Sequence, residues 1–289
     1  MPPLVTLRDD ERQTIGPTVA AALAEDIGSG DLTAALIDPD AVVGATIIAR
    51  EPFVLAGHPW ANEVFRQLDE RVLVDWYIED GQHAETDDVI CKLVGPARPL
   101  LTGERTALNF LQTLSGTATV TAQYVAAVAG TRARVLDTRK TLPGLRFAQK
   151  YAVRCGGGHN HRAGLYDAIL IKENHVKSAG SISEALRRTQ DTAADVLVEV
   201  EVESLEELRE ALDAGATRIL LDNFSLADMR EAVAINAGYG YAGAELEASG
   251  NVSLETIREI AATGVDYIST GAITKNVRAI DLSMLFRID

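Results

Sequence analysis

The chain has 289 residues, a length that corresponds to about two domains. It carries 42 acidic and 27 basic side chains, a formal net charge of −15, which makes nucleic acid and anionic membranes poor candidates for its main partner. Hydrophobic residues make up 47% of the chain, and no apolar run approaches the roughly 18 residues that span a bilayer. We expect a cytoplasmic protein, because residues 1–14 lack the apolar core of a signal peptide and two cysteines make no disulfide framework.

The first 130 residues predict a mixture of helices and strands. A short helix is predicted over 17–24, and β-like runs over 44–50 and 72–78, with Gly and Pro between them. A longer helix begins at Thr102, because leucines recur at helical spacing on one face. We expect Ser115-Gly116 to end it and a second helix to cover 121–129.

After residue 130 the pattern becomes regular. Short β-branched runs are predicted as strands at Arg134–Leu136, Ala168–Ile171, Val196–Val202, Arg218–Leu221, Ala244–Leu246 and Val265–Ser269. Helices are predicted at Ser183–Arg188, Leu205–Ala214, Leu226–Ala234 and Leu254–Ala262. This alternation favours parallel βα units, as in an α/β barrel or an open doubly wound sheet. In both folds the ligand site lies at the carboxyl ends of the strands, where this sequence places polar and small residues.

The charge is locally inverted between residues 131 and 172. That segment has nine basic and two acidic residues, a net +7, while the remainder of the chain sums to −22. A basic island in an acidic chain predicts a site for a small, multiply anionic ligand, although a solvated basic face is the alternative. Arg139 and Lys140 directly follow a predicted strand, and Arg suits bidentate binding of a carboxylate. A simple basic turn would have the same sequence there.

Lysine and glutamate side chains stand at the next two strands. Lys172 could form a Schiff base, bind an anion or lie on the surface paired with Glu173. Along the following strand, alternation places Glu199, Glu201 and Glu203 on one face. In a barrel these carboxylates would point inward and bind a cation, sugar hydroxyls or Mg²⁺, whereas an edge strand would simply expose them to water.

Three further segments have two interpretations each. Asp222 ends an apolar strand and is either a ligand or a helix N-cap. The segment Cys155–Arg162 is rich in Gly and His; zinc ligation matches no standard spacing, and a flexible loop closing over an anion is favoured. The loops at residues 249–251 and 269–271 suit backbone contacts to phosphate.

Together these segments resemble the quinolinate phosphoribosyltransferases. The resemblance is carried by GERTALNFLQTLSGTAT, DTRKTLPGLR, KYAVRCGGGHNHRAGLYDAILIKENH, EVEVESLEEL, ILLDN, EASGN and GVDYISTGAIT, which follow one another from Gly103 to Thr274. Likeness before that point is weaker, at Glu25-Asp26 and at Gly30–Thr33. The combination of DTRKT-PG-R with GGG-NHR and K-E-N-H is highly specific.

The resemblance implies a reaction, a fold and an assembly. Quinolinate and phosphoribosyl pyrophosphate would give nicotinate mononucleotide, pyrophosphate and CO2, with Mg²⁺, in NAD biosynthesis. The implied fold is an N-terminal α/β sandwich domain, residues 1–115, followed by an incomplete, about seven-stranded α/β barrel, residues 116–274, of the type II phosphoribosyltransferases. The tail 275–289 would return to the first domain. The implied assembly is a homodimer with shared active sites, or a hexamer.

The resemblance also implies residue roles. Arg139, Arg162 and Lys172 would hold the quinolinate carboxylates, with His161 close by. Arg105 would reach into the neighbouring subunit's site. The remaining implied substrate-binding residues are Thr138, Lys140, Glu201, Asp222, Ser249, Gly250, Asn251, Thr270 and Gly271. Lys140, Lys172, Glu201 and Asp222 would be catalytic, and Glu201 and Asp222 would bind Mg²⁺.

Three other interpretations remain as alternatives. A paralogous phosphoribosyltransferase-like protein associated with molybdate transport shares the fold and some motifs. A Schiff-base lyase on the same barrel would use Lys172. A non-catalytic anion-binding homologue should lack Glu201, Asp222 or a catalytic lysine, yet the sequence has all of them.

Overall fold

The computed structural model describes residues 5–192 and 196–287, and the chain divides into two compact units. Unit 1 comprises residues 1–122, 141–157 and 273–289; unit 2 comprises residues 123–140 and 158–272. The mixed α/β class predicted from the sequence is confirmed. The compact units do not coincide with the predicted barrel boundary, because 116–122 and 141–157 are grouped with unit 1.

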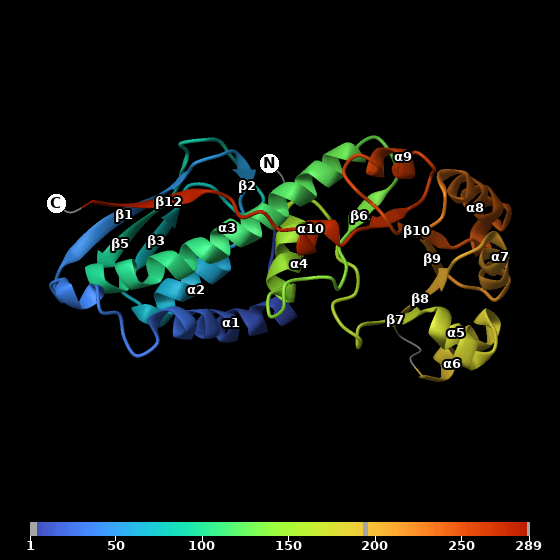
Figure 1. Ribbon diagram of the computed structural model, residues 1–289, viewed down its shortest axis with the longest axis horizontal. Helices are drawn as coiled ribbons and strands as arrows, with labels where there is room; N and C mark the ends of the chain where they lie inside the picture. Colours follow the sequence, from blue (N-terminus) through green and yellow to red (C-terminus); the bar gives the residue numbers. More distant parts are fainter. Residues whose placement is uncertain (1–4, 193–195, 288–289) are drawn as a thin grey trace. The chain divides into compact units, whose positions relative to one another are not determined.

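Unit 1 is a helical layer packed on an antiparallel sheet (Figure 1). The sheet order is β12-β1-β5-β3. Its strands are β1 (Val42–Ala49), β3 (Leu73–Trp76), β5 (Val89–Pro96) and β12 (Leu282–Arg287), and β2 (Phe53–Val54) pairs separately with β4 (His83–Ala84). The helices are α1 (Asp9–Ile27), α2 (His58–Leu68), α3 (Ala97–Ala127) and α4 (Arg146–Cys155), with a short 3₁₀ turn at Ala34–Leu36.

Apolar residues at strand and helix periodicity form the core of unit 1. Ile47 and Leu93 come from the sheet, and Trp60, Phe65 and Leu111 from the helices; each is at most 1% exposed. Burying such side chains contributes about 1.5–3 kcal/mol each. The C-terminal strand joins this core because β12 pairs with β1 in antiparallel register, from Gly44 opposite Arg287 to Ala49 opposite Leu282.

The predicted break in the helix at Ser115-Gly116 is wrong, because α3 continues to Ala127. The Ser115 hydroxyl accepts a hydrogen bond from the Ala56 N–H at 3.1 Å, so this polar side chain is satisfied without interrupting the helix. A Cβ at Gly116 would overlap the carbonyl oxygen of Arg278. Gly116 therefore allows a close approach of backbone to the helix and is not a breaker.

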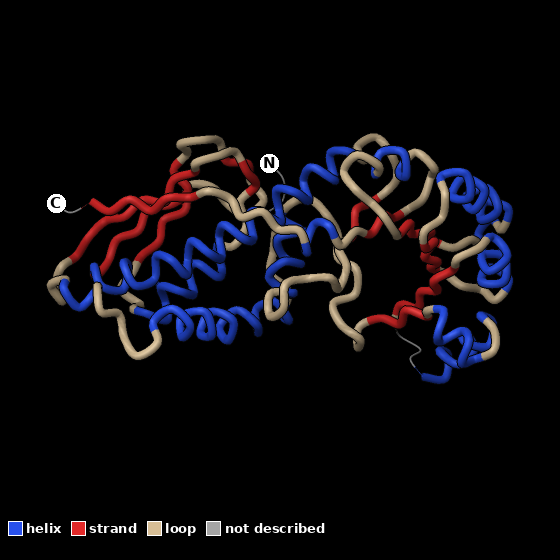
Figure 2. The backbone as a smooth tube through the Cα atoms, viewed as in Figure 1, coloured by secondary structure: helices blue, strands red, loops and turns tan. Residues whose placement is uncertain are grey.

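Unit 2 is built around six parallel strands in the order β6-β11-β10-β9-β8-β7. They are β6 (Arg134–Leu136), β7 (Ala168–Ile171), β8 (Leu197–Val202), β9 (Arg218–Asp222), β10 (Glu245–Ser249) and β11 (Tyr267–Ser269). The helices are α5 (Glu173–Ala179), α6 (Ile182–Thr192), α7 (Leu205–Asp213), α8 (Leu226–Gly238) and α9 (Ile257–Ala261), with a 3₁₀ turn at Gly240–Ala242. Helix α10 (Ala272–Lys275) begins at the last residue of unit 2, and its other residues belong to unit 1. Figure 2 shows the strands curving around a common centre with helices outside them.

The parallel sheet is an incomplete barrel with a seam between β6 and β7. Among the described residues those two strands are not paired with each other. Instead, His159 forms a parallel bridge with Leu136: its N–H donates to the Val135 carbonyl at 2.9 Å, and its carbonyl accepts from the Asp137 N–H at 3.1 Å. The segment between α4 and β7 therefore occupies part of a seventh strand position beside β6. No helix in the described part of the chain is long and apolar enough to cross a membrane.

Candidate functional site

The carboxyl ends of the parallel strands bring most of the predicted residues to one edge of unit 2. Thr138, Arg139 and Lys140 follow β6, and Lys172 follows β7. Glu201 lies near the end of β8, and Asp222 is the last residue of β9. Ser249 ends β10, and Thr270-Gly271 follow β11. Because parallel strands share a direction, residues far apart in the sequence meet at this edge.

Lys172 is an ion-paired lysine. Its Nζ lies 2.6 Å from Glu201 Oε2, across the β7–β8 pair, with about half of the Lys172 side chain exposed. Its backbone N–H donates to His175 Nδ1 at 2.9 Å where α5 begins. A paired, water-accessible ammonium is suited to anion binding; a Schiff-base lysine needs a neutral amine.

The glutamates of β8 line the inner face of the sheet. The edge-strand alternative is wrong, because β8 pairs with β7 on one side and β9 on the other. Glu199 is 1% exposed and Glu201 is partly buried, while Val200 between them is fully buried on the opposite face. Glu203 follows the strand at an exposed position, so it does not share the inner environment of the other two.

A buried charge cluster lies beneath the site, formed by His161, Glu199, Arg218 and Glu247. His161 Nε2 is 2.8 Å from Glu199 Oε2 and 3.6 Å from Glu247 Oε1. Arg218 Nη2 is 3.0 Å from Glu247 Oε2, and its Nε is 3.5 Å from Glu199 Oε1. The guanidinium also lies 3.6 Å from the centre of the Tyr267 ring, a cation–π distance.

Two members of this cluster, Arg218 and Glu247, escaped the sequence analysis. A signal existed for Glu247 alone, because Glu245 and Glu247 alternate with Leu246 as the β8 glutamates alternate with valines. Burial raises the pKa of Glu247, and the nearby Glu199 charge raises it further, whereas His161 and Arg218 oppose the shift. One arginine between two buried carboxylates keeps both from being uncompensated charges.

His161 is held by protein groups at its backbone N–H and at both ring nitrogens. Its backbone N–H donates to Asp137 Oδ1 at 2.9 Å, and its Nδ1 accepts from the Arg162 N–H at 2.7 Å. Asp137 is fully buried and its other oxygen accepts from Asn160 Nδ2 at 2.7 Å. The Asp of the DTRK motif thus anchors the Asn-His-Arg segment beside β6.

The segment Cys155–Arg162 is packed backbone, which differs from the flexible loop expected from its glycines. Cys155 is the buried last residue of α4, and a Cβ at Gly156 would overlap the Ala118 carbonyl oxygen. Gly157 has φ +80°, a conformation that favours glycine. At its end, burial lowers the pKa of Arg162, and the like charge of Arg139 lowers it further. Asp167 and Glu199 act in the opposite direction, so the charge of Arg162 is partly compensated within the protein.

The two predicted phosphate loops differ in their contacts. A Cβ at Gly271 would lie 2.9 Å from Lys140 Cδ and 3.4 Å from Thr138 Oγ1, so Gly271 supports the segment after β6. In the other loop, Gly250 and Asn251 have φ +100° and +50°. The side chain of Asn223, which follows β9, lies against both residues. Asp222 is not the helix N-cap: Ser225 caps α8, accepting the Asp228 N–H at 3.2 Å.

Two groups of side chains offer ligand atoms for a metal cation. His161, Glu199 and Glu247 place ligand atoms within 4.8 Å of one another, but Arg218 already compensates their charge. Glu201 and Asp222 are partly buried carboxylates near the ends of neighbouring strands. Mg²⁺ prefers oxygen ligands and keeps several waters, so the carboxylates of Glu201 and Asp222 are of the ligand type that it prefers, and the Lys172 ammonium already pairs with Glu201 at 2.6 Å.

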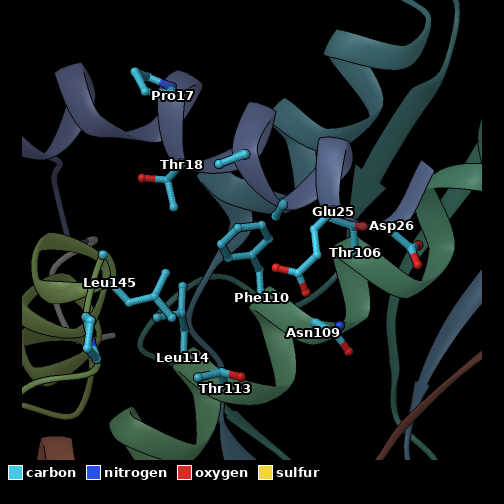
Figure 3. A pocket seen from close by; sticks show the side chains of 14 residues that line it. Pro17, Thr18, Glu25, Asp26, Thr106, Asn109, Phe110, Thr113, Leu114 and Leu145 are labelled. Atoms are coloured by element: carbon cyan, nitrogen blue, oxygen red, sulfur yellow. The ribbon is translucent and has the colours of Figure 1, made fainter. Parts of the chain in front are cut away.

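As far as the structure describes the chain, the hollows of unit 1 contain none of the site residues that lie in unit 2. One of 540 Å³ lies between α1, α3 and residues 143–145, lined by Phe110, Leu114 and Leu145 with Glu25 and Asp26 at its acidic end (Figure 3). Its lining holds no basic side chain, so it does not suit an anionic substrate. Arg105, on α3, lines a different hollow beside Asp31, which accepts a hydrogen bond from Thr102 Oγ1 at 2.8 Å. The weakly similar Gly30–Thr33 stretch therefore lies next to Arg105.

Both parts of the chain match a known protein family. Residues 117–285 match the family described as "Quinolinate phosphoribosyl transferase, C-terminal domain", and residues 31–115 match its "N-terminal domain". A probable carboxylating nicotinate-nucleotide pyrophosphorylase of Bacillus subtilis is 43% identical over 261 residues, 90% of this chain and 89% of that protein. The carboxylating nicotinate-nucleotide pyrophosphorylase of Mycobacterium leprae is 44% identical over 285 residues, 96% of this chain and 99% of that protein.

Solved structures agree with the sequence relatives. The nicotinate-nucleotide pyrophosphorylase from Francisella tularensis superposes with a TM-score of 0.91 at 46% identity, covering 99% of both chains. The corresponding structure from Ehrlichia chaffeensis has a TM-score of 0.87 at 37% identity, covering 94% of this chain and 98% of that one.

Proposed function

The chain belongs to the quinolinate phosphoribosyltransferase family, and from this premise we propose that it is a decarboxylating pentosyltransferase of NAD biosynthesis. It transfers phosphoribosyl from phosphoribosyl pyrophosphate to quinolinate and releases nicotinate mononucleotide, pyrophosphate and CO2. The observation that carries the proposal is the meeting of cations and carboxylates at the carboxyl edge of the six parallel strands.

Quinolinate binding is the part of the reaction that needs cations. The substrate has two carboxylates, and desolvating them is costly unless cations replace the lost water. The charge of Arg139 lowers the pKa of Arg162, and Lys172 is held by Glu201 at 2.6 Å. An incoming dianion would add a favourable partner for the two arginines and for Lys172. His161 supports Arg162 through its Nδ1.

Ribosyl transfer develops positive charge at the sugar carbon. Glu201 and Asp222, at the ends of β8 and β9, are placed on neighbouring strands where carboxylates stabilise such charge. Glu201 and Asp222 would also hold Mg²⁺, which neutralises the departing pyrophosphate when bound. Lys140 lies against Gly271 and brings a further cation to the pyrophosphate side. The loops at residues 249–251 and 270–271 bind the 5′-phosphate through backbone N–H groups.

Decarboxylation follows from the first step. Ribosylation makes the ring nitrogen cationic, so the ring accepts the electron pair left when the adjacent carboxylate departs as CO2. The carbon then takes a proton, for which Lys140 and Lys172 are the candidate donors. Lys172 forms an ion pair with Glu201 at 2.6 Å, which places its Nζ at the end of β8.

The assembly we propose is a homodimer, alone or within a hexamer, with Arg105 of each subunit completing its neighbour's site. Arg105 lies beside the Gly30–Thr33 stretch of unit 1, in a hollow of 440 Å³ that faces solvent in the single chain. We place the enzyme in the cytoplasm, the compartment that suits its two unpaired, buried cysteines.

The test is product detection from purified protein. Quinolinate, phosphoribosyl pyrophosphate and Mg²⁺ are incubated with the enzyme, and CO2 and nicotinate mononucleotide are measured by mass spectrometry beside a nicotinate control. Product from quinolinate alone is the expected result. Product from nicotinate instead would move the protein to the non-decarboxylating transferases. No product from either would overturn the proposal in favour of the paralogous or anion-binding alternatives.

A further inference from the structure

Asn223 lies between two groups of residues that the proposed function places around one half of the substrate. It directly follows β9 and has φ +56°, so its backbone is left-handed. Its Nδ2 donates a hydrogen bond to Asp222 Oδ2 at 2.9 Å. The side-chain amide is thus bonded to a carboxylate that contacts the ribose or Mg²⁺ in the proposed reaction.

The same residue contacts each member of the 249–251 loop. Its backbone N–H donates to the Ser249 carbonyl at 3.0 Å, one step past the Asp222–Ser249 register of β9 and β10. Its Oδ1 lies 3.5 Å from Asn251 Nδ2. A Cβ at Gly250 would overlap that oxygen, so the loop backbone passes directly over the Asn223 amide.

We propose that Asn223 is a positioning residue for the ribose 5-phosphate half of the site. It fixes the Asp222 carboxylate and the 249–251 loop in one arrangement, so that the sugar and its phosphate are held by groups set at a constant spacing. The assignment of ribose 5-phosphate to this edge rests on the proposed function. The quinolinate half, at Arg139, Arg162 and Lys172, lies after β6 and β7 and does not depend on Asn223.

Asparagine combines two properties that this position needs. It adopts the left-handed conformation more readily than most residues, and its amide supplies a donor and an acceptor at once. Asn223→Gly keeps the backbone conformation at no steric cost and removes only the amide. Asn223→Asp keeps the shape but replaces the donor with a second carboxylate beside Asp222. Asn223→Gly therefore tests loss of the hydrogen bond to Asp222, and Asn223→Asp tests its replacement by repulsion between two carboxylates.

The effect should appear in one substrate only. Because the Asn223 amide donates to a carboxylate, Asn223→Gly should raise KM for phosphoribosyl pyrophosphate about tenfold or more. KM for quinolinate should stay within about twofold, a split that a general structural defect would not produce. Asn223→Asp should be more severe than Asn223→Gly, since like charges face one another.

Binding without turnover provides a second readout. Isothermal calorimetry with ribose 5-phosphate, in the absence of quinolinate, compares wild type, Asn223→Gly and Asn223→Asp. The matched control is Asp87→Gly in unit 1, another non-glycine residue with positive φ, at +71°. We expect about tenfold weaker binding for Asn223→Gly and no change for Asp87→Gly.

A double-mutant cycle tests the contact itself. Gly250→Ala brings a Cβ against Asn223 Oδ1, and in the Asn223→Gly background that obstacle is gone. The fold-loss in ribose 5-phosphate affinity caused by Gly250→Ala should be smaller in that background than in wild type. Equal losses in both backgrounds would contradict a positioning contact.

The outcomes separate this inference from the proposed function. If wild type binds ribose 5-phosphate but forms no nicotinate mononucleotide, the proposed function fails, and weakened binding in Asn223→Gly still supports the positioning role. If wild type forms product and Asn223→Gly binds ribose 5-phosphate within about twofold of wild type, the inference alone is overturned. Absence of ribose 5-phosphate binding in wild type, or equal weakening of both substrates in Asn223→Gly, also overturns it.

Discussion

Arg162 is a partly buried cation with charged neighbours of both signs. Burial and the charge of Arg139 lower its pKa, Asp167 and Glu199 raise it, and its Nη1 donates to the Ala168 carbonyl at 3.3 Å. Removing one partner of a charge-assisted pair costs about 2–5 kcal/mol. We expect Arg162→Ala to raise KM for quinolinate by the factor that corresponds to this free energy. KM for phosphoribosyl pyrophosphate should stay nearly unchanged in the same steady-state measurement. Arg66→Ala, at an exposed pair with Glu63, is the control; an unchanged quinolinate KM in Arg162→Ala would refute the carboxylate pocket.

Glu247 gives a prediction about pH and stability. Its pKa is raised in the folded protein, first by burial and then by Glu199, so the folded state holds the proton more tightly than the unfolded state. The stability that Glu247 contributes is therefore present below its unfolded pKa, near 4.5, and is lost as pH rises toward the folded pKa. Glu247→Gln should consequently destabilise the protein more at pH 5 than at pH 8. Urea unfolding at both pH values measures this, and a larger loss at pH 8 would reverse the assigned direction.

The single residues that sequence could and could not identify differ in their setting. Arg139, Lys172 and Asp222 are identifiable because each lies at or shortly after the end of an apolar strand, and a strand end is visible in the sequence. Arg218 and Glu247 were missed because each looks like an ordinary charged residue near the start or middle of a strand. Only the three-dimensional sheet brings Arg218 of β9 within 3.0 Å of Glu247 on β10.

At the scale of elements, Gly271 links two strand ends. It follows β11 and leaves room for the Lys140 side chain that follows β6, and those strands are paired neighbours. Gly271→Ala puts a methyl group 2.9 Å from Lys140 Cδ and so displaces the lysine. We expect kcat/KM for phosphoribosyl pyrophosphate to fall about tenfold, with the melting temperature little changed. Gly44→Ala in β1, where the added atom meets only Leu93 O at 3.9 Å, should leave kinetics unaltered; equal activity in both variants would exclude the contact.

The strands of unit 2 were predictable because buried parallel strands are short apolar runs between helices. All six predicted runs correspond to β6–β11, with ends that differ by a few residues. Helix α3 was predicted in two pieces because Ser115-Gly116 is a breaker by propensity alone. Its continuity depends on Ala56 and Arg278, which are distant in sequence, and no local pattern contains that information.

At the scale of the whole chain, Gly116 is the position where the C-terminal segment packs against α3. Helix propensity favours Ala over Gly by about 1 kcal/mol, so an isolated helix would gain stability from Gly116→Ala. The Arg278 carbonyl occupies the space of the new methyl group, and overpacking costs about 1–3 kcal/mol. We expect a net loss in urea unfolding, whereas Gly238→Ala, at the end of α8 with open space around it, should cost nothing. A gain in Gly116→Ala would mean that the C-terminal segment does not pack there.

The proposed shared site makes a prediction about mixed dimers. Arg105→Ala and Lys172→Ala subunits should each be nearly inactive alone. In a heterodimer one of the two sites receives both native side chains, so isolated heterodimers should have about half of wild-type activity and a random mixture about a quarter. Mixed dimers isolated with two affinity tags provide the measurement. Zero recovery in demonstrably mixed dimers would argue that each site is made by one chain.

The path of the chain between the two units has a consequence for how this protein can be divided. The chain passes from one unit to the other at residues 122/123, 140/141, 157/158 and 272/273. The seam between β6 and β7 is where it leaves unit 2 to form α4, whose Tyr151 hydroxyl bonds Asp80 at 2.7 Å in unit 1. No single cut therefore yields two self-sufficient fragments, because each piece would lack a segment that the other carries. Unit 2 cannot be transferred to another protein by itself. Gene fusion or recombination can transfer its chemistry only by moving both units together.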